Sequence, residues 1–144
     1  MAAPAYFDTS VLVKQYVDEP GAAAARQQFR RHRIVSSVIA PIEILSALSR
    51  RQAMAQLTAP SFSRIVNDLR VDRAHWELLG VNESVLSRAE ALLPATRLRA
   101  LDALHVASAQ LAATMAGTPF PFITADTRQR AAAEQLGLDV IWVG

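Results

Sequence analysis

Ala5-Tyr6-Phe7-Asp8-Thr9-Ser10-Val11-Leu12 is the stretch of sequence that decides the fold. Its first three residues form a short apolar run that ends at Asp8. From Ser10 to Val17 the apolar residues recur at the spacing of a helix. A short apolar strand that passes into a helix at an acidic residue is typical of α/β proteins, in which strands and helices alternate along the chain.

The same alternation continues to the end of the chain. The strands are brief and continuously apolar, which favours a parallel sheet with helices on both faces. We therefore predict an α/β fold, a three-layer α/β/α sandwich with a mostly parallel sheet of about five strands, in a single domain of residues 1–144. The expected strands are 5–7, 34–36, 76–81, 120–123 and 140–143, and the expected helices are 10–17, 22–31, 37–55, 58–69, 82–93, 100–116 and 127–136. Helix 100–116 has apolar residues on nearly every face, so we expect it to be buried.

Composition excludes several classes of protein. The chain has 144 residues, of which 51% are hydrophobic and 19% charged, so it is not a disordered chain. The absence of Cys excludes a disulfide scaffold and a thiolate zinc site, and it fits a reducing compartment. No targeting or membrane-spanning segment is recognisable, and we expect a soluble cytoplasmic protein that does not bind a membrane.

Four acidic residues occupy positions that can converge. Asp8 and Asp126 follow strands, and parallel sheets bind ligands at the carboxyl ends of their strands. Glu43 and Asp102 lie inside apolar segments. Taken singly, the two strand-end acids could be helix caps, Asp102 could complement a helix dipole, and Glu43 could be a solvated position. Taken together, four clustered carboxylates would repel each other unless a cation neutralises them.

The expected cation is hard. An all-oxygen donor set suits Mg²⁺, for which Mn²⁺ can substitute, because such ions keep waters and leave positions for substrate oxygens. Zinc is disfavoured, since His32, His75 and His105 lack ligand spacing. His105 lies three residues after Asp102, so it is either packed in a core helix or supports the carboxylates. A carboxylate-held Mg²⁺ can promote phosphodiester hydrolysis.

The basic residues are consistent with a phosphate-bearing partner. The net charge is only +2, but fourteen of the fifteen basic residues are Arg, whose planar fork suits phosphate. They cluster in helix ends and loops, where they either track a phosphate backbone or are ordinary solvated side chains. The candidates for contact with such a backbone, which would be RNA if the protein is a ribonuclease, are Arg50, Arg51, Arg97 and Arg99.

Four segments resemble the acidic segments of PIN-domain nucleases. The opening stretch 6–14 resembles the first, and Ser36-Ser37 followed by Glu43 and Leu45 resembles the second. The run from Leu98 to Ala109, which contains Leu101-Asp102-Ala103-Leu104-His105, resembles the third and is the most specific. The run Thr124-Ala125-Asp126-Thr127-Arg128 resembles the fourth. Length and spacing are similar to those of the small bacterial VapC-type toxins, and the resemblance covers essentially all 144 residues.

The resemblance implies a Mg²⁺- or Mn²⁺-dependent endoribonuclease that leaves a 5′-phosphate and a 3′-hydroxyl. It implies that Asp8, Glu43, Asp102 and Asp126 hold the metal and activate water. Thr9 and Thr124 would hold carboxylates or water in place. The resemblance also implies a homodimer and a cognate antitoxin that covers the acidic site, with the helices between Ser37 and Leu69 as a plausible groove for it.

Two alternatives remain beside this interpretation. One is a catalytically silent module that keeps the fold and uses its acidic site to grip a basic partner. The other is a phosphoryl-transfer enzyme with Asp8 as nucleophile. Such phosphatases have a second Asp two residues later, where this chain has Ser10, so the second alternative is disfavoured. The five Gly residues form no phosphate-binding loop.

Overall fold

A five-stranded parallel sheet organises the molecule. The computed structural model describes residues 2–144. Every strand pairing is parallel, in the order β3-β2-β1-β4-β5, which confirms the predicted sheet. The strands are β1 (Pro4–Phe7), β2 (Arg33–Ser37), β3 (Glu77–Leu79), β4 (Phe122–Thr124) and β5 (Val140–Trp142).

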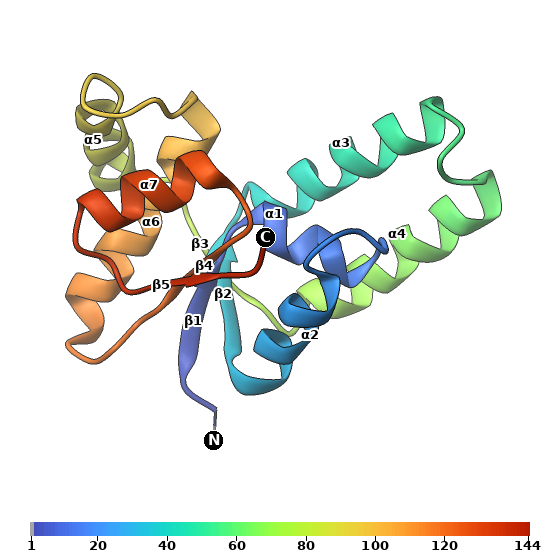
Figure 1. The fold of residues 1–144 in the computed structure, drawn as a ribbon, viewed down its shortest axis with the longest axis horizontal. Coiled ribbons are helices and arrows are strands. Elements are labelled where there is room, and N and C mark those ends of the chain that lie inside the picture. The colour runs from blue at the N-terminus through green and yellow to red at the C-terminus, as the bar shows by residue number, and fades with distance from the viewer. Residues whose placement is uncertain (1) are drawn as a thin grey trace.

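Helices cover both faces of the sheet and complete the three predicted layers (Figure 1). Alternate residues of β1 serve the two sides, because successive strand residues point to opposite faces. Phe7 packs into the core formed with α1 to α4, and Tyr6 packs into the core formed with α5 to α7. The helices are α1 (Thr9–Leu12), the 3₁₀ turn η1 (Val13–Gln15), α2 (Ala22–Arg31), α3 (Ala40–Ala53), α4 (Ala59–Arg73), α5 (Glu83–Leu92), α6 (Ala100–Ala116) and α7 (Thr127–Gln135).

The strand order places a crevice next to β1. The chain leaves β1 for β2 on one side of the sheet, and β4 later pairs with the other side of β1. In open parallel sheets such a reversal leaves a crevice at the carboxyl ends of the two strands. Phe7 is in register with Ile123, so the residues that follow them, Asp8 and Thr124, emerge side by side.

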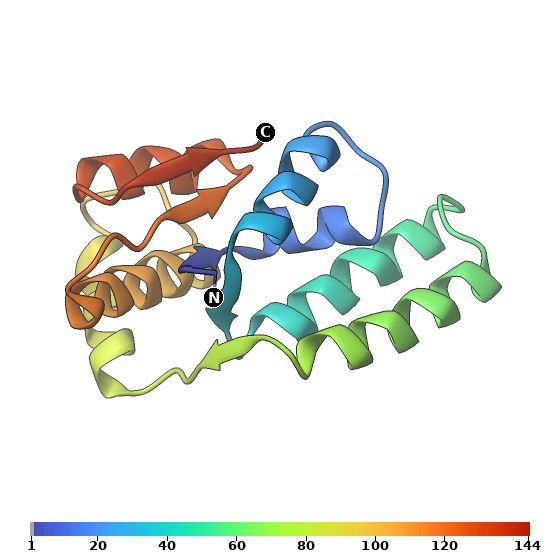
Figure 2. The same cartoon turned by 90° about the horizontal axis from the view of Figure 1, so that it is seen from below.

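Helices α3 and α4 form a hairpin that extends away from the sheet (Figures 1 and 2). The hydroxyl of Thr58 caps α4 as an acceptor for the Ser61 N–H, at 3.2 Å. Buried Ile44 and Leu48 on one helix and Leu69 on the other share a core with the sheet. No helix among the described residues is both long and apolar enough to cross a membrane.

The structure corrects several predicted boundaries. The helix expected from Ser37 begins at Ala40, because Ser37 is still paired with β3 and the following Val38 N–H donates to the Leu79 carbonyl. The helix expected over 10–17 is the short α1 followed by η1. The expected burial of α6 is wrong at its ends, where Leu101 is 47% exposed and Met115 is 86% exposed.

Candidate active site

Asp8 lies at the end of β1 and is completely buried. It caps α1, since its Oδ1 accepts the Val11 N–H at 3.3 Å and also the Ser10 hydroxyl at 2.6 Å. Its Oδ2 accepts the Thr124 hydroxyl at 2.6 Å. Burial raises the pKa of Asp8 to about 6, and the charge of Asp126 adds to the rise, although His105 and the two hydroxyls offset part of it. Asp8 therefore caps α1, and keeping its carboxylate ionised in this buried position costs free energy.

Thr124 links Asp8 to Asp126. Its hydroxyl donates to Asp8 and accepts the Asp126 N–H at 3.0 Å. Asp126 caps α7, where its Oδ1 accepts the Arg128 N–H at 2.8 Å and the Gln129 N–H at 3.4 Å. One hydroxyl thus sets the relative position of two carboxylates from neighbouring strand ends.

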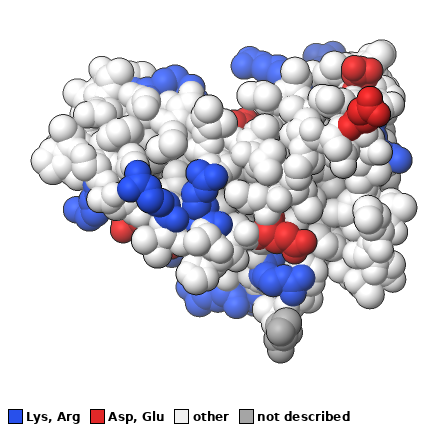
Figure 3. All heavy atoms as spheres, turned by 180° about the vertical axis from the view of Figure 1, so that it is seen from behind, with Lys and Arg blue, Asp and Glu red and all other residues white. Residues whose placement is uncertain are grey.

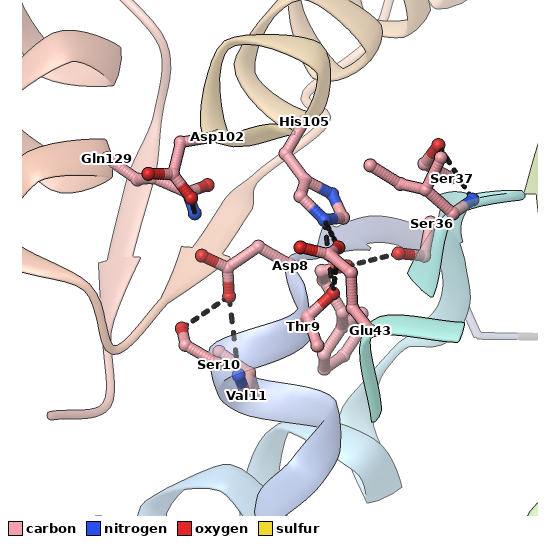
Figure 4. A network of polar contacts seen from close by, with 12 residues as sticks. Asp8, Thr9, Ser10, Val11, Ser36, Ser37, Glu43, Asp102, His105 and Gln129 are labelled. Carbon is pink, nitrogen blue, oxygen red and sulfur yellow. Dashed lines mark hydrogen bonds and ion pairs between the residues drawn. The ribbon is translucent and has the colours of Figure 1, made fainter. Parts of the chain in front are cut away.

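Glu43 reaches the same region from the first turn of α3. Its Oε1 accepts the Thr9 hydroxyl at 2.7 Å and lies 2.6 Å from the Nε2 of His105, a residue of α6 (Figure 4). Burial by itself would raise the pKa of Glu43, but the hydrogen bonds from His105 and Thr9 outweigh it, and the pKa lies below its usual value. The position of Glu43 is therefore not simply solvated.

Asp102 lies in the first turn of α6, and its carboxylate faces that of Asp8 in Figure 4. Its Oδ1 accepts the side-chain amide of Gln129 at 3.0 Å. Burial and then the charge of Asp126 raise the pKa of Asp102, and the charge of Glu43 contributes. Asp126 therefore acts on both Asp8 and Asp102, and Glu43 acts on Asp102.

A cleft of about 920 Å³ opens over these acids. Three of the four predicted carboxylates line it, whereas Asp8 is completely buried and does not, although the next two residues, Thr9 and Ser10, do. The lining also includes basic and hydroxyl side chains. Among them are Thr9, Ser10, Arg50, Arg99 and Arg128.

The donor set fits a hydrated hard cation. Glu43 and Asp126 each keep one carboxylate oxygen that accepts no hydrogen bond from residues 2–144, and the only side-chain donor to Asp102 among these residues is Gln129. Within the same residues, no three His, Asp or Glu side chains are grouped so that they could by themselves hold a metal ion. Mg²⁺ is commonly bound by one or two carboxylates and keeps several waters, so it does not require a complete protein cage.

Comparison with known proteins identifies the family. Residues 5–135 match the PIN domain. The chain belongs to the PIN-domain family. It is 39% identical over 137 residues to Ribonuclease VapC46 of Mycobacterium tuberculosis (strain ATCC 25618 / H37Rv). The aligned region covers 94% of this chain and 95% of that protein.

Solved structures share the fold at lower identity. A toxin–antitoxin complex from Klebsiella pneumoniae has a chain that matches with a TM-score of 0.68 at 19% identity, over 97% of this chain and 98% of its own. PAE2754 from Pyrobaculum aerophilum matches with a TM-score of 0.60 at 18% identity, over 94% and 93% of the two chains. FitAcB from Neisseria gonorrhoeae matches with a TM-score of 0.59 at 15% identity, over 94% and 95%.

The four predicted arginines of this PIN domain have different surroundings. Arg50 and Arg99 line the cleft. Arg97 lines a neighbouring hollow of about 530 Å³, which shares Thr127 and Arg128 with the cleft. Arg51 forms an ion pair with Glu19 and is not among the residues that line the cleft. Lys and Arg side chains also lie in several separate groups over the face drawn in Figure 3.

Sequence reasoning missed three side chains of the candidate site. Ser10 and Gln129 donate to Asp8 and Asp102, and Arg128 lines both hollows. Ser10 and Gln129 each lie two or three residues after a predicted acid, in the first turn of a helix, which is the signal that could have found them. His105 is both packed in a core helix and in contact with a carboxylate, since it is 1% exposed and lies against Glu43.

Proposed function

We propose that this PIN domain is an endoribonuclease and the toxin of a toxin–antitoxin pair. The observation that carries the proposal is the set of four acids at the reversal point of the sheet, three of them lining one cleft. The similarity to Ribonuclease VapC46 over nearly the whole of both chains supports RNA as the substrate. The similarity to a chain of a toxin–antitoxin complex supports the biological role.

Asp8, Glu43, Asp102 and Asp126 would hold the metal ion, some of them directly and the others through its bound waters, and we propose that the ion is Mg²⁺, with Mn²⁺ as a substitute. When bound, the ion would supply Lewis acidity that polarises the phosphodiester and makes water a better nucleophile at neutral pH. The chain supplies geometry, because the hydroxyls of Thr9 and Thr124 fix Glu43 and Asp8 by hydrogen bonds of 2.7 and 2.6 Å. Crowding these carboxylates costs free energy, because burial and like charges disfavour their ionised forms. A bound cation would offset that cost.

The arginines at the rim would bind the RNA backbone. Arg50 and Arg99 lie on the cleft itself, so each can contact a phosphate next to the scissile bond. Arg97 and Arg128 line the adjoining hollow, where a flanking nucleotide would lie. Attack by water on the phosphorus would leave a 5′-phosphate and a 3′-hydroxyl.

An antitoxin protein is proposed as the regulator, in the cytoplasm, together with a homodimer of this chain. The antitoxin would cover the acidic cleft and contact the helices between Ser37 and Leu69. Exposed apolar residues at the edge of the cleft suit such a partner, since Ile42 is 69% exposed and Leu101 is 47% exposed.

Sequencing of RNA 5′ ends in cells tests this function. Induction of the wild-type chain without an antitoxin should create new 5′-phosphate ends at defined sites. The matched control is Asp102→Asn, which keeps an amide oxygen as acceptor for Gln129 and loses the negative charge. If wild type creates no new 5′ ends, or if Asp102→Asn creates them equally, the proposal is contradicted and a catalytically silent module is favoured.

A further inference from the structure

A series of polar contacts runs from Tyr6 in the core through His105 to Glu43, and Figure 4 shows the contact between His105 and Glu43. The Tyr6 hydroxyl lies 2.8 Å from Nδ1 of His105, and Nε2 of His105 lies 2.6 Å from Oε1 of Glu43. Tyr6 is completely buried and His105 is 1% exposed, while the Glu43 side chain is 20% exposed. These polar contacts therefore connect a buried phenol to a carboxylate at the edge of the cleft.

The donor and acceptor roles in these contacts follow from the residues at the two ends, the Tyr6 hydroxyl and the Glu43 carboxylate. A phenol carries its hydrogen at neutral pH, so the buried Tyr6 hydroxyl can donate to Nδ1 of His105, which lies 2.8 Å away. A hydrogen bond received at Nδ1 leaves the ring hydrogen on Nε2, which lies 2.6 Å from Oε1 of Glu43 and 3.1 Å from the Thr9 hydroxyl oxygen. We assign to His105 the tautomer with its hydrogen on Nε2, because Nδ1 accepts the hydrogen bond from Tyr6.

The contacts of Glu43 divide its two oxygens. Oε1 receives hydrogen bonds from both Thr9 and His105, whereas Oε2 receives none from residues 2–144. A Glu side chain has several rotatable bonds, and two donors on one oxygen restrict them. The result is a carboxylate with one oxygen fixed by the protein and one oxygen available to a ligand in the cleft.

The aromatic packing gives these contacts a fixed frame. The Tyr6 ring stacks on Phe122 with centroids 5.7 Å apart, and the Tyr6 and His105 rings form a T-shaped contact with centroids 5.8 Å apart. Apolar side chains could fill this volume without the cost of burying polar groups. A buried polar chain that ends on a candidate metal ligand instead resembles the outer hydrogen bonds that orient ligands in metal sites.

We propose that Tyr6 and His105 are positioning residues that orient the carboxylate of Glu43 toward a divalent cation. The proposal rests on the proposed function, because it presupposes that Glu43 is a metal ligand. His105 acts through Glu43, and Tyr6 acts through His105. Neither residue needs to touch the RNA or the scissile phosphate.

Two substitutions of His105 separate positioning from packing. In His105→Gln the side-chain amide nitrogen can take the place of Nε2 and still donate to Glu43. In His105→Asn the amide nitrogen is near the place of Nδ1, so it faces Tyr6 and cannot reach Glu43. Tyr6→Phe removes the hydroxyl and keeps the ring. Phe122→Leu is the control, since it loosens the packing on Tyr6 and leaves the polar chain intact.

The experiment measures the Mn²⁺ dissociation constant of each folded variant by calorimetry, together with kcat and KM for RNA cleavage at several Mn²⁺ concentrations. Outer hydrogen bonds of this kind contribute ~10–100-fold to metal affinity. His105→Asn should lose affinity in that range, with much of the lost kcat recovered at high Mn²⁺. His105→Gln should recover most of the affinity. Tyr6→Phe should show a smaller loss, and it should add little in the His105→Asn background. Phe122→Leu should lower the melting temperature and leave the affinity unchanged.

Several results would overturn the inference. Equal Mn²⁺ affinity of His105→Asn and wild type would exclude positioning, and equal losses in His105→Gln and His105→Asn would assign the effect to packing. A wild-type chain that binds Mn²⁺ without cleaving RNA would refute the proposed function alone, because the ranking of affinities would still decide the role of His105. A wild-type chain that binds no Mn²⁺ would refute both.

Discussion

Replacing Asp8 with Asn is expected to stabilise the metal-free protein while it abolishes RNA cleavage. Asn is nearly isosteric with Asp, and its amide oxygen can still accept the Ser10 hydroxyl and the Val11 N–H. Its amide nitrogen can donate to the Thr124 hydroxyl, which lies 2.6 Å from Oδ2 in the wild type. The substitution therefore removes a buried charge and retains the hydrogen bonds around it.

The magnitude follows from the pKa of Asp8, which burial raises from 3.8 to about 6 in the folded protein. The folded state binds the proton more tightly than the unfolded state, so stability is greatest below the unfolded pKa and falls as the pH rises through the folded pKa. A shift of about 2 pKa units at 1.36 kcal/mol per unit corresponds to about 3 kcal/mol above pH 6. For a chain of this size, that amounts to roughly 10 °C in melting temperature.

The assay is chemical unfolding of wild type and Asp8→Asn in EDTA at several pH values from 4 to 7.5. The variant should gain little at pH 4 and about 3 kcal/mol by pH 7. Taking the difference between the two proteins cancels the titration of Glu43 and Asp102. A variant that is less stable than wild type at pH 7, or a difference that does not grow with pH, would refute the reasoning.

Three further outcomes are expected from the same site. Saturating Mn²⁺ at 100 times its dissociation constant should raise the unfolding free energy of wild type by about 2.7 kcal/mol, and Asp8→Asn should gain far less in a thermal shift assay. Thr124→Val should cost about 1–3 kcal/mol because Asp8 loses a buried donor, whereas Thr124→Ser should stay close to wild type in urea unfolding. Arg99→Ala should weaken RNA binding and reduce the salt slope by about one, while Arg51→Ala should leave the slope unchanged because Glu19 already engages Arg51; equal slopes for the two variants would contradict this assignment.

Much of the fold could be predicted from the sequence because its signals are local. Short apolar runs marked all five strands, and helix-breaking or capping residues marked most helix ends. The start of α3 was wrong for a nonlocal reason, since Ser37 remains in β2 to pair with β3. Full burial was wrong for Leu101 and Met115, because periodicity does not say which part of an apolar helix the sheet covers.

The candidate acids were predictable, whereas their partners were not. Asp8 and Asp126 follow strands, and that position alone brings them together in a parallel sheet. The contact of Gln129 with Asp102 depends on how α7 packs beside α6, which no local pattern reports. The ion pair of Arg51 with Glu19 joins α3 to the loop before α2. The adjacent Arg50 lines the cleft, so two neighbouring arginines that look alike in the sequence have different surroundings.

Cleavage of RNA by the purified, antitoxin-free chain tests the central claim most directly. Wild type, Asp102→Asn and Glu43→Gln would be incubated with total RNA in Mg²⁺, in Mn²⁺ and in EDTA, and the new ends would be mapped. We predict cuts with 5′-phosphates by wild type in either metal, and none in EDTA or by the two variants. Cleavage that persists in EDTA, or that survives in both variants, would contradict a metal-dependent nuclease centred on these carboxylates.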